Sequence, residues 1–102
     1  MPMTIAILEA KPERRLHVRQ ALEEMVEESP LEDPELRRYE LYESRDDQGV
    51  FVIQQDVPVI DELMRDRVAE RMMEIGTALR DELRSPIRVS HMQLIRSSRH
   101  EV

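Results

Sequence analysis

Apolar residues change their spacing several times along this chain, and each change predicts a new element of secondary structure. Residues 4–10 (TIAILEA) and 50–56 (VFVIQQD) each contain four consecutive apolar residues, which is typical of strands with both faces covered. Residues 38–43 (RYELYE) and 87–95 largely alternate between the two faces of a strand. The chain is therefore expected to form four strands.

Two amphipathic stretches lie between these strands. Residues 13–29 and 58–84 carry apolar side chains at helical spacing, so each predicts a helix. Six prolines fall at the joints between segments, where a missing N–H does least harm, and residues 30–37 are expected to form a loop. The order βαββαβ predicts an α+β, ferredoxin-like fold with a four-stranded antiparallel sheet and both helices on one face. We expect one domain over residues 1–102, with 96–102 as a frayed tail.

The chain contains only two glycines, and each has a predicted structural role. Gly49 ends a predicted hairpin connection, where Asp46 and Asp47 supply turn hydrogen bonds and the glycine supplies a positive φ. Gly76 lies inside the second predicted helix, at a cost of about 1 kcal/mol relative to alanine, which favours close packing there.

Composition narrows the classes of function. The formal net charge is −7, from 22 acidic and 15 basic residues, which disfavours binding to nucleic acid and to anionic membranes. Cysteine is absent, so disulfides, thiolate nucleophiles and cysteine metal sites are excluded. The chain has neither a signal-peptide pattern nor an apolar stretch near the roughly 20 residues that cross a bilayer. We expect a cytoplasmic protein.

A few polar side chains on predicted strands are candidates for chemistry. His91 is the only histidine on a predicted strand and is a candidate base, although a hydrogen-bonded structural histidine is the commoner case. Tyr39 and Tyr42 point to opposite faces, and Tyr42 is the candidate hydrogen-bonding group of the two. The amides of Gln54 and Gln55 suit either a ligand carbonyl or a dimer interface, with Gln55 as the candidate for the ligand. No spacing of histidines and carboxylates resembles a metal site, so no metal is expected.

Several short motifs resemble the antibiotic biosynthesis monooxygenase-like family of the dimeric α+β barrel superfamily. These motifs are Lys11-Pro12, Tyr39-Glu40-Leu41, Asp46-Asp47 and Phe51-Val52-Ile53. The resemblance covers roughly residues 4–57 in detail and the remainder in layout. It implies a homodimer formed through the sheet face, with a pocket between sheet and helices in each subunit. It also implies oxidation of quinols or aromatic polyketides by O2 without metal or flavin.

The chain departs from this family pattern at several positions. Gln55 and Val57 stand where the family often has Glu and Trp, and Asp66 falls near the histidine of the second helix. Ile5 replaces the asparagine of haem-degrading relatives, and tryptophan is absent, so haem cleavage is unsupported. The favoured hypothesis is a cofactor-independent monooxygenase acting on a small quinol-like or phenolic compound. The alternative is a non-catalytic dimeric module of the same fold that binds a small aromatic ligand or is purely structural.

Overall fold

The strands form one antiparallel sheet. A computed structural model describes residues 2–32, 39–56 and 62–98 of the chain. The strands are β1 (Pro2–Glu9), β2 (Tyr39–Glu43), β3 (Val50–Asp56) and β4 (Arg88–Gln93). They lie side by side in the order β2-β3-β1-β4, and every neighbouring pair is antiparallel. This order confirms the predicted ferredoxin-like α+β fold.

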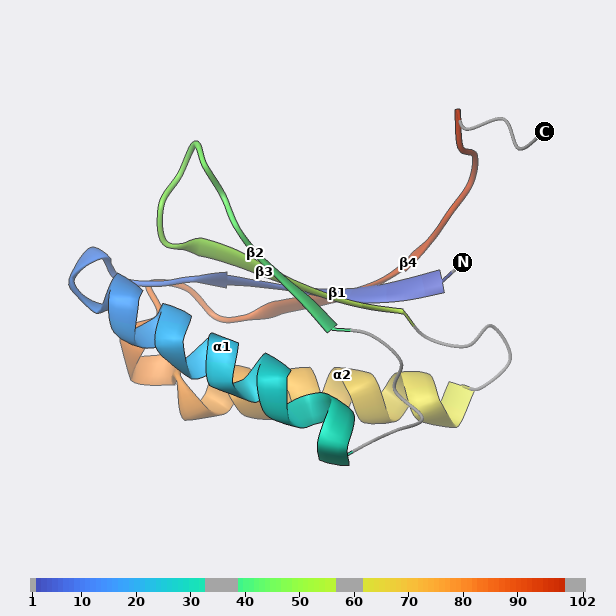
Figure 1. Ribbon diagram of the computed structural model, residues 1–102, viewed down its shortest axis with the longest axis horizontal. Helices are drawn as coiled ribbons and strands as arrows, with labels where there is room; N and C mark the ends of the chain where they lie inside the picture. Colours follow the sequence, from blue (N-terminus) through green and yellow to red (C-terminus); the bar gives the residue numbers. More distant parts are fainter. Residues whose placement is uncertain (1, 33–38, 57–61, 99–102) are drawn as a thin grey trace.

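Both long helices cover the same face of the sheet (Figure 1). These are α1 (Arg15–Glu32), preceded by the 3-10 turn η1 (Pro12–Arg14), and α2 (Glu62–Ala78), followed by the 3-10 turn η2 (Arg80–Glu82). The two helices run in opposite directions, and no helix of the described residues lies on the opposite face of the sheet (Figure 1). The chain after β4 rises away from the sheet on that uncovered side.

Three predicted boundaries are wrong. Helix α1 continues to Glu32 instead of ending at Ser29, because proline removes one backbone donor but keeps a helical φ. Helix α2 ends at Ala78, before the predicted end at Arg84. The helical spacing of apolar residues continues to Leu83 because Leu83 also packs into the core, although it follows the 3-10 turn. Strand β4 ends at Gln93. The predicted loop beyond Glu32, the start of the second helix and the end of the tail lie outside the described residues.

The core lies between the helices and the covered face of the sheet. Burial alternates along β3, where every second side chain from Phe51 is buried, and the same alternation runs along β1. The buried apolar residues form one cluster with contributions from β1, β2, β3 and both helices, and the partly buried Val89 of β4 packs against it. The cluster consists of Ala6, Leu8, Ala10, Val18, Leu22, Tyr39, Phe51, Ile53, Val68, Met72, Leu79 and Leu83.

Residues of the uncovered face retain partial exposure although many are apolar. Ile5, Ile7, Val50 and Val52 are half-buried there, and Tyr42 is 49% exposed. The four consecutive apolar residues in β1 and in β3 therefore supply both the core and an apolar second face.

Ion pairs fix one end of the domain, where β1 leads into η1 and the hairpin connects β2 to β3. Arg15 of α1 donates two hydrogen bonds to Glu43 of β2, from Nε at 2.6 Å and Nη2 at 3.1 Å. The Glu43 carboxylate also accepts the Gly49 backbone N–H at 3.1 Å. Arg84 adds a hydrogen bond to Asp47 at 3.2 Å. These contacts join α1 and the segment after η2 to the hairpin, and we call this end of the domain the fixed end.

Both glycine predictions are confirmed. Gly49 has φ of 97°, which an L side chain rarely adopts. Gly76 packs directly on Ile87, and a Cβ there would lie 2.7 Å from Ile87 Cβ. Close approach of α2 to the segment before β4 therefore requires a glycine.

Candidate functional site

A row of four polar side chains crosses the covered face of the sheet, one from each strand. Tyr39 pairs with Gln55, Gln55 pairs with Thr4, and Thr4 pairs with His91. Directly opposed residues project to the same face, and Thr4, Gln55 and Tyr39 are buried beneath the helices. We call this set the polar row. It lies at the end of the sheet opposite to the fixed end.

Gln55 is the most unusual member of the polar row. Its side chain is fully buried, and neither Oε1 nor Nε2 has a hydrogen-bond partner among the described residues. Leaving a buried donor or acceptor unsatisfied costs about 1–3 kcal/mol, so such groups call for an explanation. An amide that offers a free acceptor and a free donor at the same point is suited to holding a polar ligand.

His91 and Thr4 form a hydrogen-bonded pair beside this amide. Thr4 Oγ1 lies 2.8 Å from His91 Nδ1, and Thr4 is fully buried whereas His91 is exposed. In the tautomer with its proton on Nδ1, the ring donates to Thr4 and leaves Nε2 as an acceptor. The row therefore runs from the exposed imidazole of His91 to the fully buried amide of Gln55.

The structure brings two of the three sequence-predicted site residues into the same row. Gln55 and His91 share the covered face, but Tyr42 lies on the uncovered face, where its hydroxyl donates to Glu40. Tyr39, and not Tyr42, is the tyrosine that shares the covered face with Gln55. The two tyrosines are three residues apart, so strand alternation requires them to point to opposite sides.

Thr4 was not identified from the sequence. Threonine is common in strands, so its presence there carries no functional signal. Its position in the strand could have identified it. Thr4 alternates with the buried Ala6 and Leu8 on the inward-facing side of β1, and Gln55 alternates in the same way with the buried Phe51 and Ile53 of β3. A polar residue that continues a buried apolar series is the pattern to search for.

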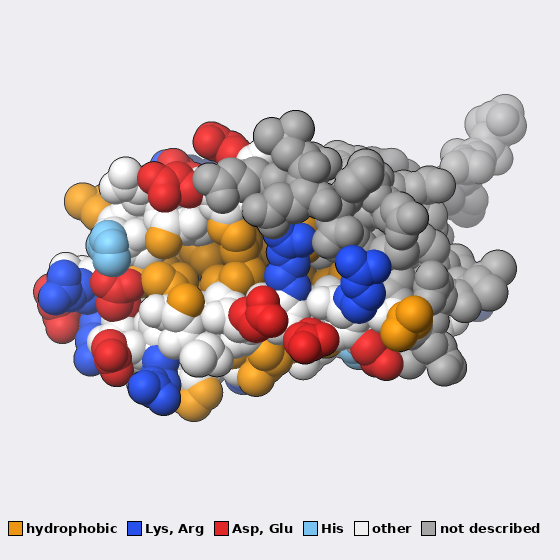
Figure 2. All heavy atoms as spheres, turned by 90° about the horizontal axis from the view of Figure 1, so that it is seen from below, with side chains coloured by type: hydrophobic (Ala, Val, Ile, Leu, Met, Phe, Trp, Pro, Cys, Tyr) orange, Lys and Arg blue, Asp and Glu red, His pale blue; other side chains and the backbone are white. Residues whose placement is uncertain are grey.

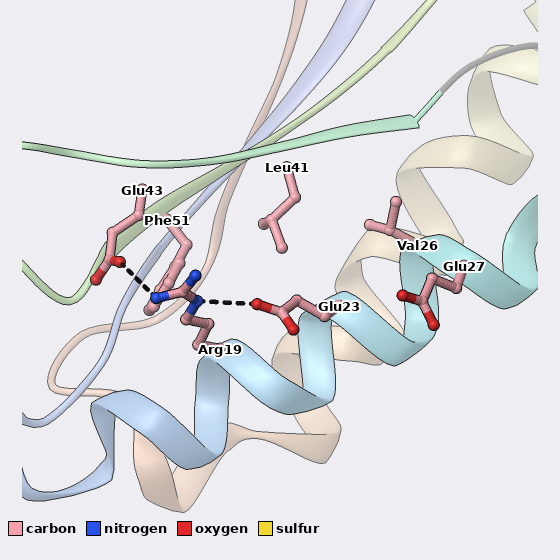
Figure 3. Close-up of a pocket in the computed structure, with 7 residues that line it drawn as sticks. All are labelled: Arg19, Glu23, Val26, Glu27, Leu41, Glu43 and Phe51. Carbon is pink, nitrogen blue, oxygen red and sulfur yellow. Dashed lines mark hydrogen bonds and ion pairs between the residues drawn. The ribbon is translucent and has the colours of Figure 1, made fainter.

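A groove lined by both apolar and charged side chains lies on the same face, between α1 and the edge strand β2 (Figure 3). It has a volume of about 370 Å³, within the usual range of small-ligand sites. Its lining residues are Arg19, Glu23, Val26, Glu27, Leu41, Glu43 and Phe51. Leu41 pairs with Ile53, two pairs along the strands from Tyr39 and Gln55, or about 7 Å. The groove thus places apolar surface beside the polar row.

Arginines hold the charged wall of this groove. Arg19 Nε donates to Glu23 at 2.9 Å and Arg19 Nη1 lies 3.9 Å from Glu43, as Figure 3 shows. The hydrogen bonds from Arg15 lower the pKa of Glu43, and the Gly49 N–H and the arginine charges act in the same direction. Glu43 is therefore ionised and paired at neutral pH, which makes it a structural group of the wall.

The helix-covered side is mixed in character. Hydrophobic side chains form a patch near its middle, and charged side chains of both signs surround the patch (Figure 2). Within the described parts of the chain, no three histidine or acidic side chains are grouped so as to hold a metal ion. None of the described helices is long and apolar enough to span a membrane.

The fold and the position of the row between sheet and helices define a ferredoxin-like α+β protein with a candidate ligand site inside the domain. The family model for antibiotic biosynthesis monooxygenase matches residues 1–55, more than half of the chain, and the chain belongs to this family. The match includes Thr4, Tyr39 and Gln55 and stops before α2 and β4.

Solved structures share the fold over nearly the whole chain. A crystal structure of an antibiotic biosynthesis monooxygenase superposes with a TM-score of 0.75 at 24% identity, covering 94% of this chain and all of the other. The Rv0793 protein of Mycobacterium tuberculosis gives a TM-score of 0.71 at 24% identity, covering 97% and 100%. A conserved protein from Methanosarcina mazei Go1 gives 0.72 at 17% identity, covering 90% of each chain. No curated protein sequence matches the chain.

Proposed function

We propose that this protein is a cofactor-independent monooxygenase that acts on a small quinol-like or phenolic compound in the cytoplasm. Membership of the monooxygenase family supports the class of reaction. The single observation that carries the site assignment is the fully buried Gln55 amide with no partner among the described residues, in one row with the Thr4–His91 pair.

The polar row supplies the groups that such a reaction needs. Gln55 binds the oxygen substituents of the substrate, and His91 Nε2 accepts the phenolic proton while Nδ1–H stays on Thr4. The resulting phenolate is electron-rich enough to react with O2. One oxygen atom is incorporated and the other leaves as water, so a phenol and O2 give a quinone and water. The substrate supplies all the electrons.

The spacing of the row fits a small aromatic ligand. Gln55 and His91 are two strands apart, so their Cα atoms are separated by about 10 Å at the usual strand spacing. At this separation, Gln55 and His91 engage the oxygens on one edge of a single aromatic ring from the two sides of Thr4. Because exposure is greatest at His91, the substrate enters at the β4 edge.

We further propose a homodimer formed through the uncovered face. That face carries the half-buried Ile5, Ile7, Val50 and Val52 together with exposed Tyr42. Soluble monomers seldom expose contiguous apolar surface of this kind. The interface leaves the polar row free, because the row lies on the covered side.

Oxygen consumption with a panel of reduced quinols and phenols tests the proposed function. Without added metal or flavin, the wild-type protein should consume one O2 per substrate, release no peroxide and place one labelled atom from ¹⁸O2 in the product. His91→Ala should lower turnover by about 10²–10⁴-fold, as expected for loss of a general base.

Two variants serve as controls for this assay. His17→Ala removes an exposed histidine of α1 that pairs with Glu82 at the fixed end, opposite to the row, and should keep full turnover. Tyr42→Phe should also keep turnover, and a loss there would move the reaction to the uncovered face. The proposal is wrong if the panel supports no O2 uptake, or if the two histidine variants behave alike.

One observation favours the non-catalytic alternative. Asp66, which falls where the family resemblance has a histidine, is exposed on α2 and adds no base to the row. Tight ligand binding without O2 consumption would identify the protein as a binding module.

A further inference from the structure

We propose that Gln55 selects ligands with two adjacent oxygens on one edge of an aromatic ring, as in a catechol. This inference rests on the proposed function, because it specifies which member of the quinol-like and phenolic class the same site binds. It assigns Gln55 as the specificity-determining residue of the polar row.

Both Oε1 and Nε2 of Gln55 are buried without partners in the described part of the chain. A primary amide holds its acceptor and its donor side by side in one plane. A ligand satisfies both when it presents a donor next to an acceptor on a single edge.

Among dihydroxybenzenes, only the 1,2-isomer meets this requirement. One hydroxyl of catechol donates to Oε1, and the neighbouring oxygen accepts from Nε2. A lone phenol or a 1,4-quinol reaches one end of the amide and leaves the other buried and unpaired, which is the costly arrangement. The site therefore discriminates between isomers mainly because a wrong isomer leaves one end of the Gln55 amide without a hydrogen-bond partner.

The charge of the surroundings favours a neutral ligand. The polar row contains no lysine or arginine, and Thr4 is already bonded to His91. Arg19 in the neighbouring groove is held by Glu23 and Glu43. A carboxylate placed at Gln55 would be buried without a compensating cation among these residues, so a diol is preferred to an ionised acid of the same size.

Calorimetric titration under argon tests this selection without allowing turnover. Catechol, resorcinol and hydroquinone have the same atoms and differ only in hydroxyl spacing, and salicylate adds an ionised control. We expect catechol to bind the wild-type protein about tenfold more tightly than the other isomers, the effect of roughly one further satisfied hydrogen bond. Salicylate should bind more weakly than catechol.

Two variants locate the selectivity. Gln55→Met keeps the length of the side chain and removes both polar atoms, so it should bind the three isomers equally. Gln54→Met makes the same change on the adjacent residue, whose side chain lies on the uncovered face, and should keep the preference for catechol. Gln55→Leu repeats the test if Gln55→Met does not fold.

The inference is overturned if the wild-type protein binds the isomers equally, binds none of them, or loses its preference in Gln54→Met as well. O2 uptake measured on the same samples separates it from the proposed function. Oxidation of para-quinols without a preference for catechol refutes the selection and keeps the reaction. Selective catechol binding without O2 uptake refutes the reaction and keeps the selection.

Discussion

Replacing Gln55 with methionine should stabilise the folded protein while removing the preference for catechol. The wild-type amide is fully buried with two polar atoms that have no partner among the described residues. Each such group costs about 1–3 kcal/mol, and methionine fills a similar volume with apolar atoms. Allowing for imperfect packing, we expect the free energy of unfolding to rise by about 1–3 kcal/mol. For a domain of this size, each kcal/mol raises Tm by roughly 4–8 °C.

Guanidinium unfolding followed by circular dichroism measures this change. The midpoint should rise with an unchanged slope, which marks an effect on stability and not on compactness. Gln48→Met, at an exposed position of the hairpin connection, should stay within about 0.5 kcal/mol of wild type. If Gln55→Met is neutral or destabilising, the amide is satisfied by an enclosed water and is a structural group, and the argument for a ligand site at Gln55 is refuted.

Three further perturbations test other parts of the structure. Gly76→Ala should destabilise the protein by about 1–3 kcal/mol in thermal melts, and Ile87→Ala should relieve that loss in a double-mutant cycle; additive effects would contradict the contact. Glu43→Gln should flatten the acid side of the stability–pH curve, because Arg15 lowers the pKa of Glu43 in the folded state. The stabilisation from this ion pair is present above the unfolded pKa of Glu43 and is lost as the pH falls through the folded pKa. An unchanged curve would exclude the pair. Val52→Glu should convert the proposed dimer to a folded monomer in light scattering, whereas a dimer that survives would place the interface elsewhere.

The architecture was predictable because helices and strands each impose a characteristic spacing on the apolar residues that face the core. Runs of four apolar residues in β1 and β3 predicted strands with apolar side chains on both faces, and Gly49 predicted a turn with positive φ. Element ends were less predictable. Leu83 keeps helical spacing in sequence although the chain has already left α2, since a 3-10 turn can deliver an apolar side chain to the same core.

The candidate site was only partly predictable, because a row across a sheet depends on register. Alternation within β2 separates Tyr39 from Tyr42, but it does not say which of them faces the helices. The pairing of Thr4 with both Gln55 and His91 joins residues from the beginning, middle and end of the chain. No local pattern contains that information, and the Thr4–His91 hydrogen bond follows from it.

The side-chain amide of Gln55 tests the central claim most directly, because its two protons appear in a ¹H–¹⁵N correlation spectrum. Comparison of wild type with Gln55→Met and Gln54→Met assigns the signals of both glutamines. On titration with catechol under argon, the Gln55 signals should shift in proportion to occupancy while those of Gln54 stay in place. Saturable binding that leaves the Gln55 signals unmoved would contradict a ligand site in the polar row.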